Sequence, residues 1–348
     1  MNFLSDNSSP VHPDVMAALI KANEGHSDSY GADAAMDNVR QMVRDIFEAP
    51  DAAVYLVTTG TAANALALAS VIQPWQTVYA HAESHINIDE CGAPQFFSGG
   101  AKLAELAGDH GKISPQDLEK AIQSTPVGDV HTYQRGAVSI TNTSEAGTVY
   151  TCAEVAALSV VAKRYRLPLH MDGARLANAL AALGCSPAEM TWKSGVDILS
   201  IGGTKNGLMG VECVVLFDKN NAWEFELRRK RGGHLVSKHR YLSVQMEAYL
   251  TDDLWLGMAR TANARGARLA TGLTAIEGIE LAHPVQANMV FPNISRAKHR
   301  TAMDAGAMYS LAPFGTSLEG DKDEVLASRM VCSWSTTEAE VDQLLGLW

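Results

Sequence analysis

The stretch that decides the fold is Asp197-Ile198-Leu199-Ser200-Ile201-Gly202-Gly203-Thr204-Lys205-Asn206-Gly207, an apolar run that ends in small residues and one lysine. A second apolar run, Leu167-Pro168-Leu169-His170-Met171-Asp172-Gly173-Ala174-Arg175, comes about thirty residues earlier and ends in an acid and a base. Two strands joined by a crossover of that length form one βαβ unit, and parallel strands present functional groups at their carboxyl ends. We therefore expect Asp172, Arg175 and Lys205 to meet at one edge of one sheet.

These three side chains have a defined chemistry if they meet. A lysine that forms a Schiff base and an aspartate that pairs with a pyridinium nitrogen are what pyridoxal phosphate (PLP) requires from a protein. Asp172 could instead cap a helix, and Arg175 could be a surface residue or could hold an anion beside the ring. Most lysines are solvated surface groups, so the interpretation of Lys205 depends on its place at the end of a strand.

Gly60 and Thr61 lie between a predicted strand over residues 54–57 and a predicted helix over residues 62–71. Backbone N–H groups at the start of a helix, with a hydroxyl nearby, bind phosphate. Turns of this kind are also common as purely structural elements. Beside a lysine and an aspartate of the type just described, we interpret this one as a phosphate site.

His81 and His85 raise the alternative of a metal site, because two histidines four residues apart can share one face of a helix. The spacing is not that of zinc proteases, and no cysteine is placed to help. We therefore predict no metal and interpret one of the imidazoles as stacking on a flat cofactor ring. Arg329 lies in an apolar, strand-like run, where it needs an anionic partner, either a substrate carboxylate or a structural salt bridge.

The whole chain predicts an α/β protein with two domains. Strands alternate with helices up to about residue 217, which favours a mostly parallel sheet covered on both faces. Thr151 is a predicted N-cap with Glu154 completing a capping box. A long helix over residues 252–273 then opens a smaller C-terminal unit, so we divide the chain into residues 1–248 and residues 249–348.

Composition restricts the partners. A net charge of −11 argues against nucleic acid as the main partner. No apolar run reaches the ~20 residues of a membrane span, and the N-terminus does not have the pattern of a signal peptide. The five cysteines are scattered and form no CxxC, which is typical of reduced thiols in a cytoplasm. We expect a cytoplasmic enzyme with a small-molecule substrate.

At this point the chain resembles, over essentially its whole length, the PLP-dependent threonine aldolases of the aspartate aminotransferase superfamily (fold type I). The segments at residues 85–97 and 186–207 are especially similar to the low-specificity L-threonine aldolase and L-phenylserine aldolase branch. The resemblance rests on the order and spacing of these landmarks: Ser5-Asp6-Asn7, His12-Pro13, Tyr30-Gly31-x-Asp33, Thr59-Gly60-Thr61-Ala62-Ala63-Asn64, His85 with Glu90, Asp172-Gly173-Ala174-Arg175, Thr204-Lys205 and Arg329.

The resemblance implies a role for each candidate residue. Lys205 would carry the Schiff base, Asp172 would pair with the pyridinium, and His85 would stack on the ring. The remaining assignments are phosphate binding by Gly60 and Thr61, the substrate carboxylate at Ser5, Arg175 and Arg329, and a site lined by Tyr30. Members of the family are commonly tetramers with sites at dimer interfaces, so a neighbour would donate part of the cofactor site from the basic segment 228–238, with Lys238 as the candidate.

The implied reaction is retro-aldol cleavage of L-threonine, L-allo-threonine or L-phenylserine to glycine and an aldehyde. Many relatives place a histidine after an Asn-Thr pair, but here Asn142-Thr143 is followed by Ser144-Glu145. The base for the substrate hydroxyl would therefore be His85, Glu90 or water. A β-eliminating lyase, an amino-acid racemase, a PLP-binding sensor and a metal-dependent hydrolase remain as alternatives, and the preferred aldehyde is left open.

Overall fold

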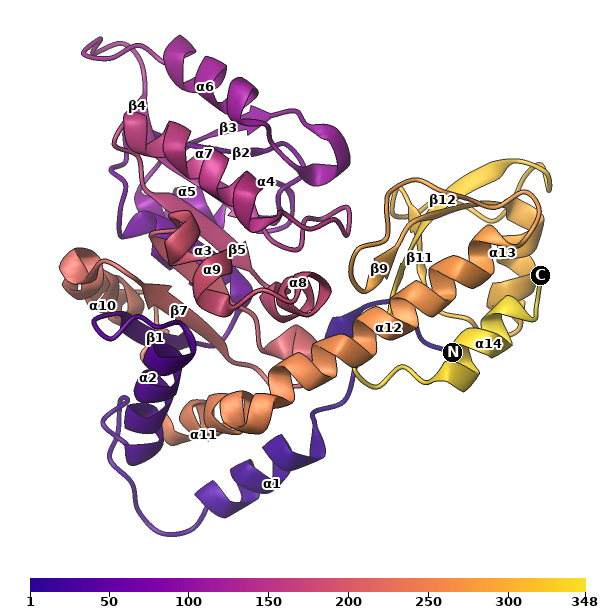
Figure 1. The fold of residues 1–348 in the computed structure, drawn as a ribbon, viewed down its shortest axis with the longest axis horizontal. Coiled ribbons are helices and arrows are strands. Elements are labelled where there is room, and N and C mark those ends of the chain that lie inside the picture. Colours follow the sequence, from indigo (N-terminus) through magenta and orange to yellow (C-terminus); the bar gives the residue numbers. More distant parts are fainter.

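The computed structural model describes residues 1–348 and shows two sheets of different size (Figure 1). The larger sheet has seven strands in the order β1-β7-β6-β5-β4-β2-β3. All its pairings are parallel except those of β7, which runs antiparallel to both β1 and β6. The prediction of a mostly parallel sheet is therefore confirmed. The strands are β1 (Ala53–Val57), β2 (Gln76–His81), β3 (Lys102–Leu106), β4 (Gln134–Thr141), β5 (Leu169–Gly173), β6 (Ile198–Ile201) and β7 (Glu212–Leu216).

Helices cover both faces of this sheet, as the alternation along β1 shows. Val54 and Leu56 pack into the main core, whereas Tyr55 and Val57 pack against α3 and α10 on the opposite face. An almost entirely apolar strand is expected when both faces are buried. The helices of this part are α1 (Pro13–Ala22), α2 (Ala34–Ile46), α3 (Gly60–Ala69), α4 (His85–Ile88), α5 (Ala93–Ser98), α6 (Pro115–Ser124), α7 (Cys152–Arg164), α8 (Leu176–Leu183), α9 (Pro187–Met190), α10 (Ala222–Arg231) and α11 (Arg240–Leu250).

Local signals set the helix ends close to the predicted positions. The capping box of α7 is present: the Thr151 hydroxyl accepts the Glu154 N–H (3.2 Å), and the Glu154 carboxylate accepts the Thr151 N–H (2.7 Å). Helix α3 begins two residues earlier than predicted, at Gly60, because the Thr59 hydroxyl caps it by accepting the N–H of Ala62 (3.1 Å).

The predicted βαβ unit is present at the centre of the sheet. Strands β5 and β6 are parallel neighbours, with Asp172 opposite Ser200 in the register. Gly202 and Gly203 allow the chain beyond β6 to pass close to its surroundings: a Cβ at Gly202 would lie 2.0 Å from the Ala174 carbonyl oxygen, and one at Gly203 would lie 2.5 Å from the Val211 carbonyl oxygen. The two glycines therefore permit the close approach that brings the lysine turn to the end of β5.

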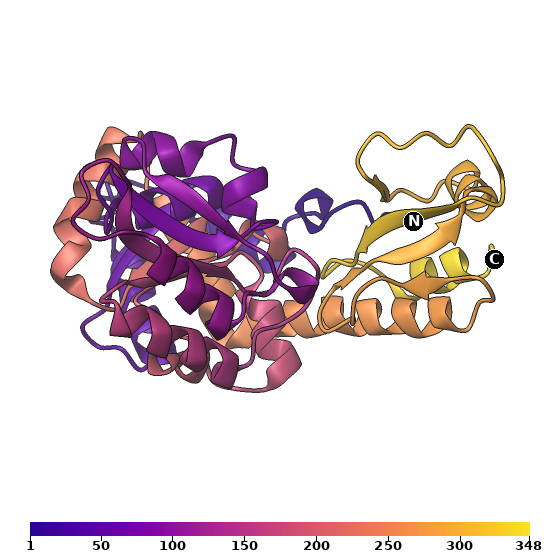
Figure 2. The ribbon, with the colours of Figure 1, turned by 90° about the horizontal axis from the view of Figure 1, so that it is seen from above.

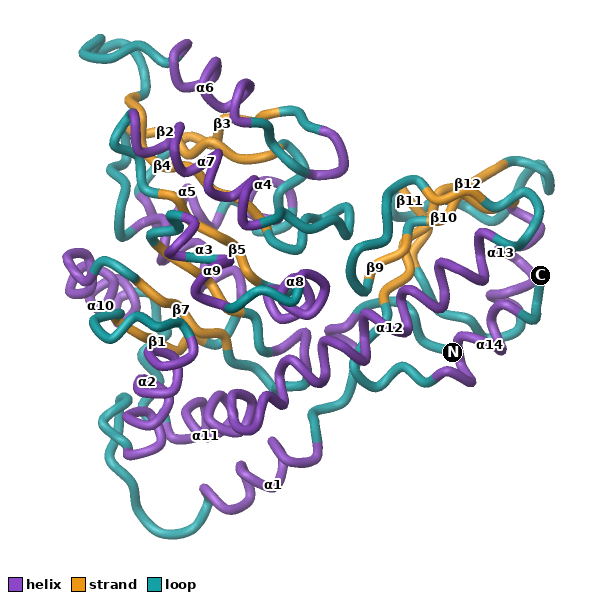
Figure 3. The backbone as a smooth tube through the Cα atoms, viewed as in Figure 1, coloured by secondary structure: helices purple, strands orange, loops and turns teal.

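The smaller sheet lies in the C-terminal part, where Figure 3 shows its strands grouped apart from the larger sheet. Its core contains Leu269, Val290, Ile294 and Met330, and it also takes in Phe3 from the N-terminus. Its elements are β8 (Glu280–Leu281), β9 (Met289–Val290), β10 (Pro292–Ser295), α13 (Arg296–Asp304), β11 (Ser310–Ala312), β12 (Val325–Val331) and α14 (Glu338–Leu345).

One long helix, α12 (Leu254–Thr274), links the two parts, and Figure 2 shows it running from the large part along the lower side of the C-terminal part. Trp255 and Met258 at its beginning belong to the core of the large sheet, whereas Leu269 and Leu273 belong to the second core. The helix starts slightly later than predicted because Asp252 and Asp253 have φ angles of 49° and 56°. The boundary between residues 248 and 249 stays a prediction. Neither α12 nor any other helix is long and apolar enough to cross a membrane.

Candidate active site

A cavity of about 260 Å³ opens at the carboxyl edge of the large sheet, where several predicted residues meet. Its walls come from the ends of β1, β5 and β6, from the start of α3 and from the first residues of the chain. Five of the predicted site residues line it directly. The lining residues are Asn7, Thr58, Thr59, Gly60, Thr61, Asn64, His85, Asp172, Ala174, Thr204, Lys205 and Glu212.

Asp172 is buried at the end of β5 with both carboxylate oxygens in use. The Ala174 N–H donates to Oδ1 (3.0 Å), and the Asn64 side-chain amide donates to Oδ2 (2.9 Å). Arg175 occupies the N-cap position of the next helix, α8, so the alternative of Asp172 as its N-cap is wrong. Asp172 therefore presents a buried carboxylate to the cavity.

Asn64 extends this carboxylate into a hydrogen-bonded chain that the sequence analysis did not predict. Its amide also donates to the Glu90 carboxylate (2.9 Å), which accepts the Nδ1–H of His85 (2.8 Å). This hydrogen bond raises the pKa of His85 above its ordinary value. Burial raises the pKa of Glu90, and its hydrogen bond with His85 acts in the opposite direction. The chain fixes the His85 ring through Nδ1 and leaves Nε2 without a protein partner.

The same three titratable groups, His85, Glu90 and Asp172, have ligand atoms within 4.8 Å of one another, a separation that a metal ion could bridge. The Asn64 amide already donates to both carboxylates, which satisfies part of their charge. His81 is not part of this group. Its Nε2 bonds to the Gly108 carbonyl oxygen (3.0 Å) and its Nδ1 accepts the Glu83 N–H (3.1 Å), so neither nitrogen is left for a shared metal site with His85.

The first turn of α3 also lines the cavity. Nothing stands within 4 Å of the position that a Cβ on Gly60 would take, so the space in front of this turn is open. Helix α3 is ten residues long and its first N–H groups have no intrahelical partner. Such a helix end attracts an anion.

Lys205 is half-buried on the short 3-10 turn Thr204–Asn206 that follows β6. Behind this turn lies Glu212, the first residue of β7, whose carboxylate accepts the Gly203 N–H (2.6 Å). Burial raises the pKa of Glu212, while the hydrogen bond from the Gly203 N–H and the charge of Lys205 lower it. The sequence analysis missed this residue, although a lone acid at the head of an apolar strand was a signal.

Arg175 lies beside the cavity but forms a buried ion pair that the sequence analysis did not predict. Its Nε and Nη2 donate to the two carboxylate oxygens of Asp6 (2.6 and 2.9 Å), and Asn288 of the small domain also donates to Asp6 (3.1 Å). Ser5 precedes this aspartate and caps its short 3-10 turn by accepting the Asn7 N–H (3.2 Å). The N-terminal segment is thereby joined to both domains next to the cavity.

Arg329 lies in the middle of β12, opposite Ser310, and does not line this cavity. Its Nε is buried and has no hydrogen-bond partner. The guanidinium forms no ion pair within the chain, so the alternative of a structural salt bridge is wrong. The positive charge of Arg329 is therefore not balanced by any carboxylate of this chain.

Tyr30 and Lys238 also lie outside the cavity of this chain, but they lie near each other. The Tyr30 N–H donates to the Ser237 carbonyl oxygen (3.1 Å), and Lys230 lies 4.9 Å from the centre of the Tyr30 ring. Tyr30 is 49% exposed, and Lys238 is exposed as well. The two predicted residues thus belong to one exposed basic and aromatic surface.

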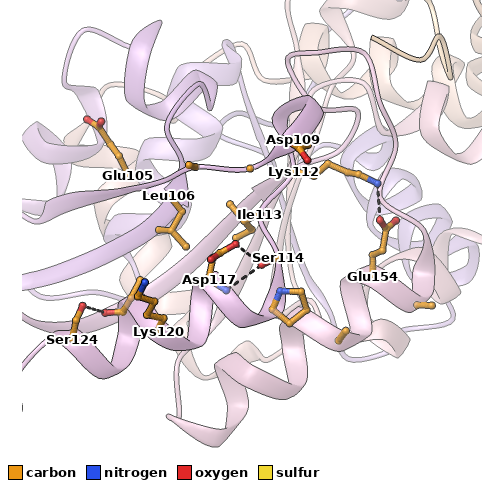
Figure 4. Close-up of a pocket in the computed structure, with 16 residues that line it drawn as sticks. Glu105, Leu106, Asp109, Lys112, Ile113, Ser114, Asp117, Lys120, Ser124 and Glu154 are labelled. Atoms are coloured by element: carbon orange, nitrogen blue, oxygen red, sulfur yellow. Dashed lines mark hydrogen bonds and ion pairs between the residues drawn. The ribbon is translucent and has the colours of Figure 1, made fainter.

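A second, larger hollow of about 1000 Å³ lies between β3, α6 and the start of α7 (Figure 4). An ion pair between Lys112 and Glu154 (2.6 Å) closes one side, and the walls carry both acidic and basic side chains. None of the predicted site residues lines it. Its size alone therefore does not make it the candidate active site.

The smaller cavity fits the cofactor that the sequence predicts. Its lining includes a buried carboxylate, the open start of a helix and a lysine. Buried polar atoms without a partner also occur in its lining, namely Asn64 Oδ1 and Thr204 Oγ1. A ring nitrogen, a phosphate and a carbonyl group are the ligand features that match these three places.

Known proteins support this assignment. The family described as "Beta-eliminating lyase" matches residues 2–295. The chain is 39% identical over 343 residues to a low specificity L-threonine aldolase of Pseudomonas sp. (strain NCIMB 10558), covering 98% of this chain and 95% of the relative. A low specificity L-threonine aldolase of Pseudomonas aeruginosa is 39% identical over 344 residues, with the same coverage of 98% and 95%.

A solved structure gives the same result at the level of the fold. The Leishmania major threonine aldolase structure matches with a TM-score of 0.91 and 28% sequence identity, and the match covers 99% of this chain and 98% of that chain. Together with the matches in sequence, this agreement extends over both domains. The chain belongs to the β-eliminating lyase family of fold type I PLP enzymes, on its threonine aldolase branch.

Proposed function

We propose that this protein is a PLP-dependent aldolase that cleaves L-threonine, L-allo-threonine and related β-hydroxy-α-amino acids to glycine and an aldehyde. One observation carries the proposal. Lys205, Asp172 and the start of α3 surround a single cavity, in a chain that aligns nearly end to end with proteins named L-threonine aldolase. When bound, PLP supplies the electron sink for the carbon–carbon bond that breaks.

Four groups of this chain would hold the cofactor. Lys205 binds its carbonyl carbon, and the Asp172 carboxylate keeps a proton on the ring nitrogen. The N–H groups at Gly60 and Thr61 bind the phosphate. The imidazole of His85 is fixed through Glu90 and would stack on the cofactor ring.

The substrate carboxylate would bind between the two domains. Arg329 has an unpartnered, buried Nε and forms no ion pair, and a carboxylate would supply the missing anion. Arg175 is already held at Nε and Nη2 by Asp6, which leaves Nη1 for a second contact. Ser5 lies next to this pair along the chain. Fixing the carboxylate at two points sets which bond of the substrate stands perpendicular to the ring.

The proton of the β-hydroxyl needs a base, and His85 is the group of this chain that we propose for it. Glu90 occupies Nδ1, so Nε2 is available to accept a proton. The position after Asn142-Thr143, where many relatives have a histidine, holds Ser144, and the Ser144 hydroxyl donates to the His110 carbonyl oxygen (3.1 Å). The Ser144 hydroxyl is therefore engaged in a contact between its loop and the turn at residues 109–111.

We further propose a cytoplasmic homotetramer, a dimer of dimers with the active site at the dimer interface. The exposed surface around Tyr30, Lys230 and Lys238 supports this, because it carries residues expected at the site yet does not line the cavity of its own chain. A neighbouring subunit would contribute this surface to the active site. The five unpaired cysteines are compatible with a reducing compartment.

The test is aldehyde release by the purified protein with added PLP, measured as kcat/KM on L-threonine, L-allo-threonine and L-threo-phenylserine. We expect cleavage of the first two at comparable rates, and a strong preference for phenylserine would indicate an aryl-accepting pocket. Lys205→Ala should abolish turnover and the visible absorbance of the cofactor complex. Ammonia with a keto acid, or the D-enantiomer, in place of aldehyde would contradict the aldolase assignment in favour of a β-eliminating lyase or a racemase.

A further inference from the structure

Glu212 is a buried acid that the proposed function does not use. It is the first residue of β7, is 6% exposed, and pairs with Val57 of β1 in the sheet register. It also lines the cavity that contains Lys205. A buried carboxylate is costly unless charged or hydrogen-bonding partners compensate for it.

The partners of Glu212 all belong to the turn that carries Lys205. The Gly203 N–H donates to its carboxylate (2.6 Å), and the backbone N–H of Thr204 lies close to the same carboxylate. Because these neighbours are donors, the carboxylate acts as an acceptor for the whole turn. Gly203 and Thr204 are the two residues before Lys205, so the position of the lysine depends on them.

Among the titratable groups near Glu212, Lys205 is the one that carries a positive charge. Tyr249 and Cys213 also face the carboxylate, but both are buried neutral groups whose pKa values lie far above the physiological range because of burial. The Tyr249 hydroxyl is engaged elsewhere, since it donates to the Gly202 carbonyl oxygen (3.0 Å) and accepts from Asn206 (2.8 Å). The cation near Glu212 is Lys205, which also lies near the Asp6 carboxylate and the His85 imidazole.

We propose that Glu212 is a positioning residue that holds the Gly203–Thr204 turn and stabilises positive charge on the Lys205 nitrogen. This inference rests on the proposed function, because it assigns Lys205 to the cofactor. Asp172 and Glu212 then have different roles. Asp172 holds a proton at the ring nitrogen, and Glu212 favours a proton at the lysine nitrogen.

The decisive variant is Glu212→Gln, which keeps an acceptor oxygen for the Gly203 N–H and removes only the charge. The readout is the pH midpoint of the change in visible absorbance of the PLP-loaded protein. Glu212 lines the same cavity as the lysine nitrogen. Removal of its negative charge should lower this midpoint by about one pH unit, the lower end of the ~1–3 units that a nearby opposite charge produces. Glu212→Ala also removes the acceptor and should in addition release PLP faster on dilution.

Asp197→Asn provides a matched control. Asp197 also accepts a backbone N–H, that of Leu169 (2.8 Å), but it immediately precedes β6, at the end opposite to the lysine turn. This variant should leave the midpoint unchanged. An unchanged midpoint in Glu212→Gln, or an equal shift in Asp197→Asn, would overturn the inference and reduce Glu212 to a structural role. A wild-type protein that forms no coloured complex with PLP would instead refute the proposed function itself.

Discussion

The buried ion pair between Asp6 and Arg175 allows a quantitative test of how the N-terminal segment supports the site. The two side chains are 2% and 7% exposed, and their closest N–O distance is 2.6 Å. Burial alone would raise the pKa of Asp6, but the charge and hydrogen bonds of Arg175 outweigh it, so the pKa lies below the ordinary value of 3.8. The perturbation is Asp6→Asn, which removes the charge with little change in shape.

The expected loss follows from the burial of the partner that remains. Removing one member of a buried pair leaves an uncompensated charge and costs about 3–5 kcal/mol. The exposed pair Lys193–Glu48 has the same N–O distance, 2.6 Å, but its side chains are 39% and 55% exposed. Glu48→Gln should therefore cost less than about 1 kcal/mol. Two pairs with equal geometry and different burial separate the effect of solvent from that of distance.

The assay is the free energy of unfolding from urea denaturation at pH 7, with saturating PLP in every sample. A double variant, Asp6→Leu with Arg175→Met, should recover much of the loss caused by Asp6→Asn, because no buried charge is then left unpaired. Because the pKa of Asp6 is depressed in the folded state, its contribution is complete above 3.8 and is lost as the pH falls through the folded value. The difference between wild type and Asp6→Asn should shrink accordingly in acid. Equal losses for Asp6→Asn and Glu48→Gln would refute the reasoning.

Three further predictions concern Gly60, which lines the cavity, and two residues that lie behind its lining. Gly60→Ala should weaken PLP binding about tenfold without lowering stability, because its Cβ meets no protein atom but enters the phosphate space. Equilibrium binding of PLP tests the loss of affinity, and thermal unfolding of the apoprotein tests the unchanged stability. Gly202→Ala should lower stability by at least about 2 kcal/mol, because its Cβ would lie 2.0 Å from a carbonyl oxygen, and a normal unfolding midpoint would contradict this. Glu90→Gln should lower the titration midpoint of His85 in NMR, since the raised pKa of His85 comes mainly from Glu90. In the wild type the contribution of His85 to stability is present below pH 6.5 and is lost as the pH rises through its folded value.

The parts of the site that follow from local pattern could be predicted from the sequence. Asp172 and Lys205 end two successive apolar strands, and the rule for parallel strands brings such ends together. The same holds for the start of α3, which a glycine and threonines mark. Asn64 could have been found in the same way, because a single amide within a run of alanines and leucines needs a buried partner.

The parts that depend on distant segments could not be predicted in this way. Asp6 and Arg175 are 169 residues apart, and their pairing requires the path of the N-terminus between the two domains. The sequence predicts a role for Arg175 and includes Asp6 only in the landmark Ser5-Asp6-Asn7, and it does not show that Asp6 holds Arg175. Tyr30 and Lys238 do not line the cavity of their own chain, and no rule about strands or helices predicts where they lie relative to it.

Helix α12 has a consequence for any attempt to divide this protein. Trp255 and Met258 complete the core of the large sheet, while Leu269 and Leu273, on the same helix, complete the other core. Phe3 crosses in the opposite direction, from the first residues of the chain into the C-terminal core. A single cut before, within or after α12 therefore removes apolar side chains from at least one interior. Fragments made at any such cut should aggregate or stay unfolded when expressed alone, and they should recover structure only when both are present together.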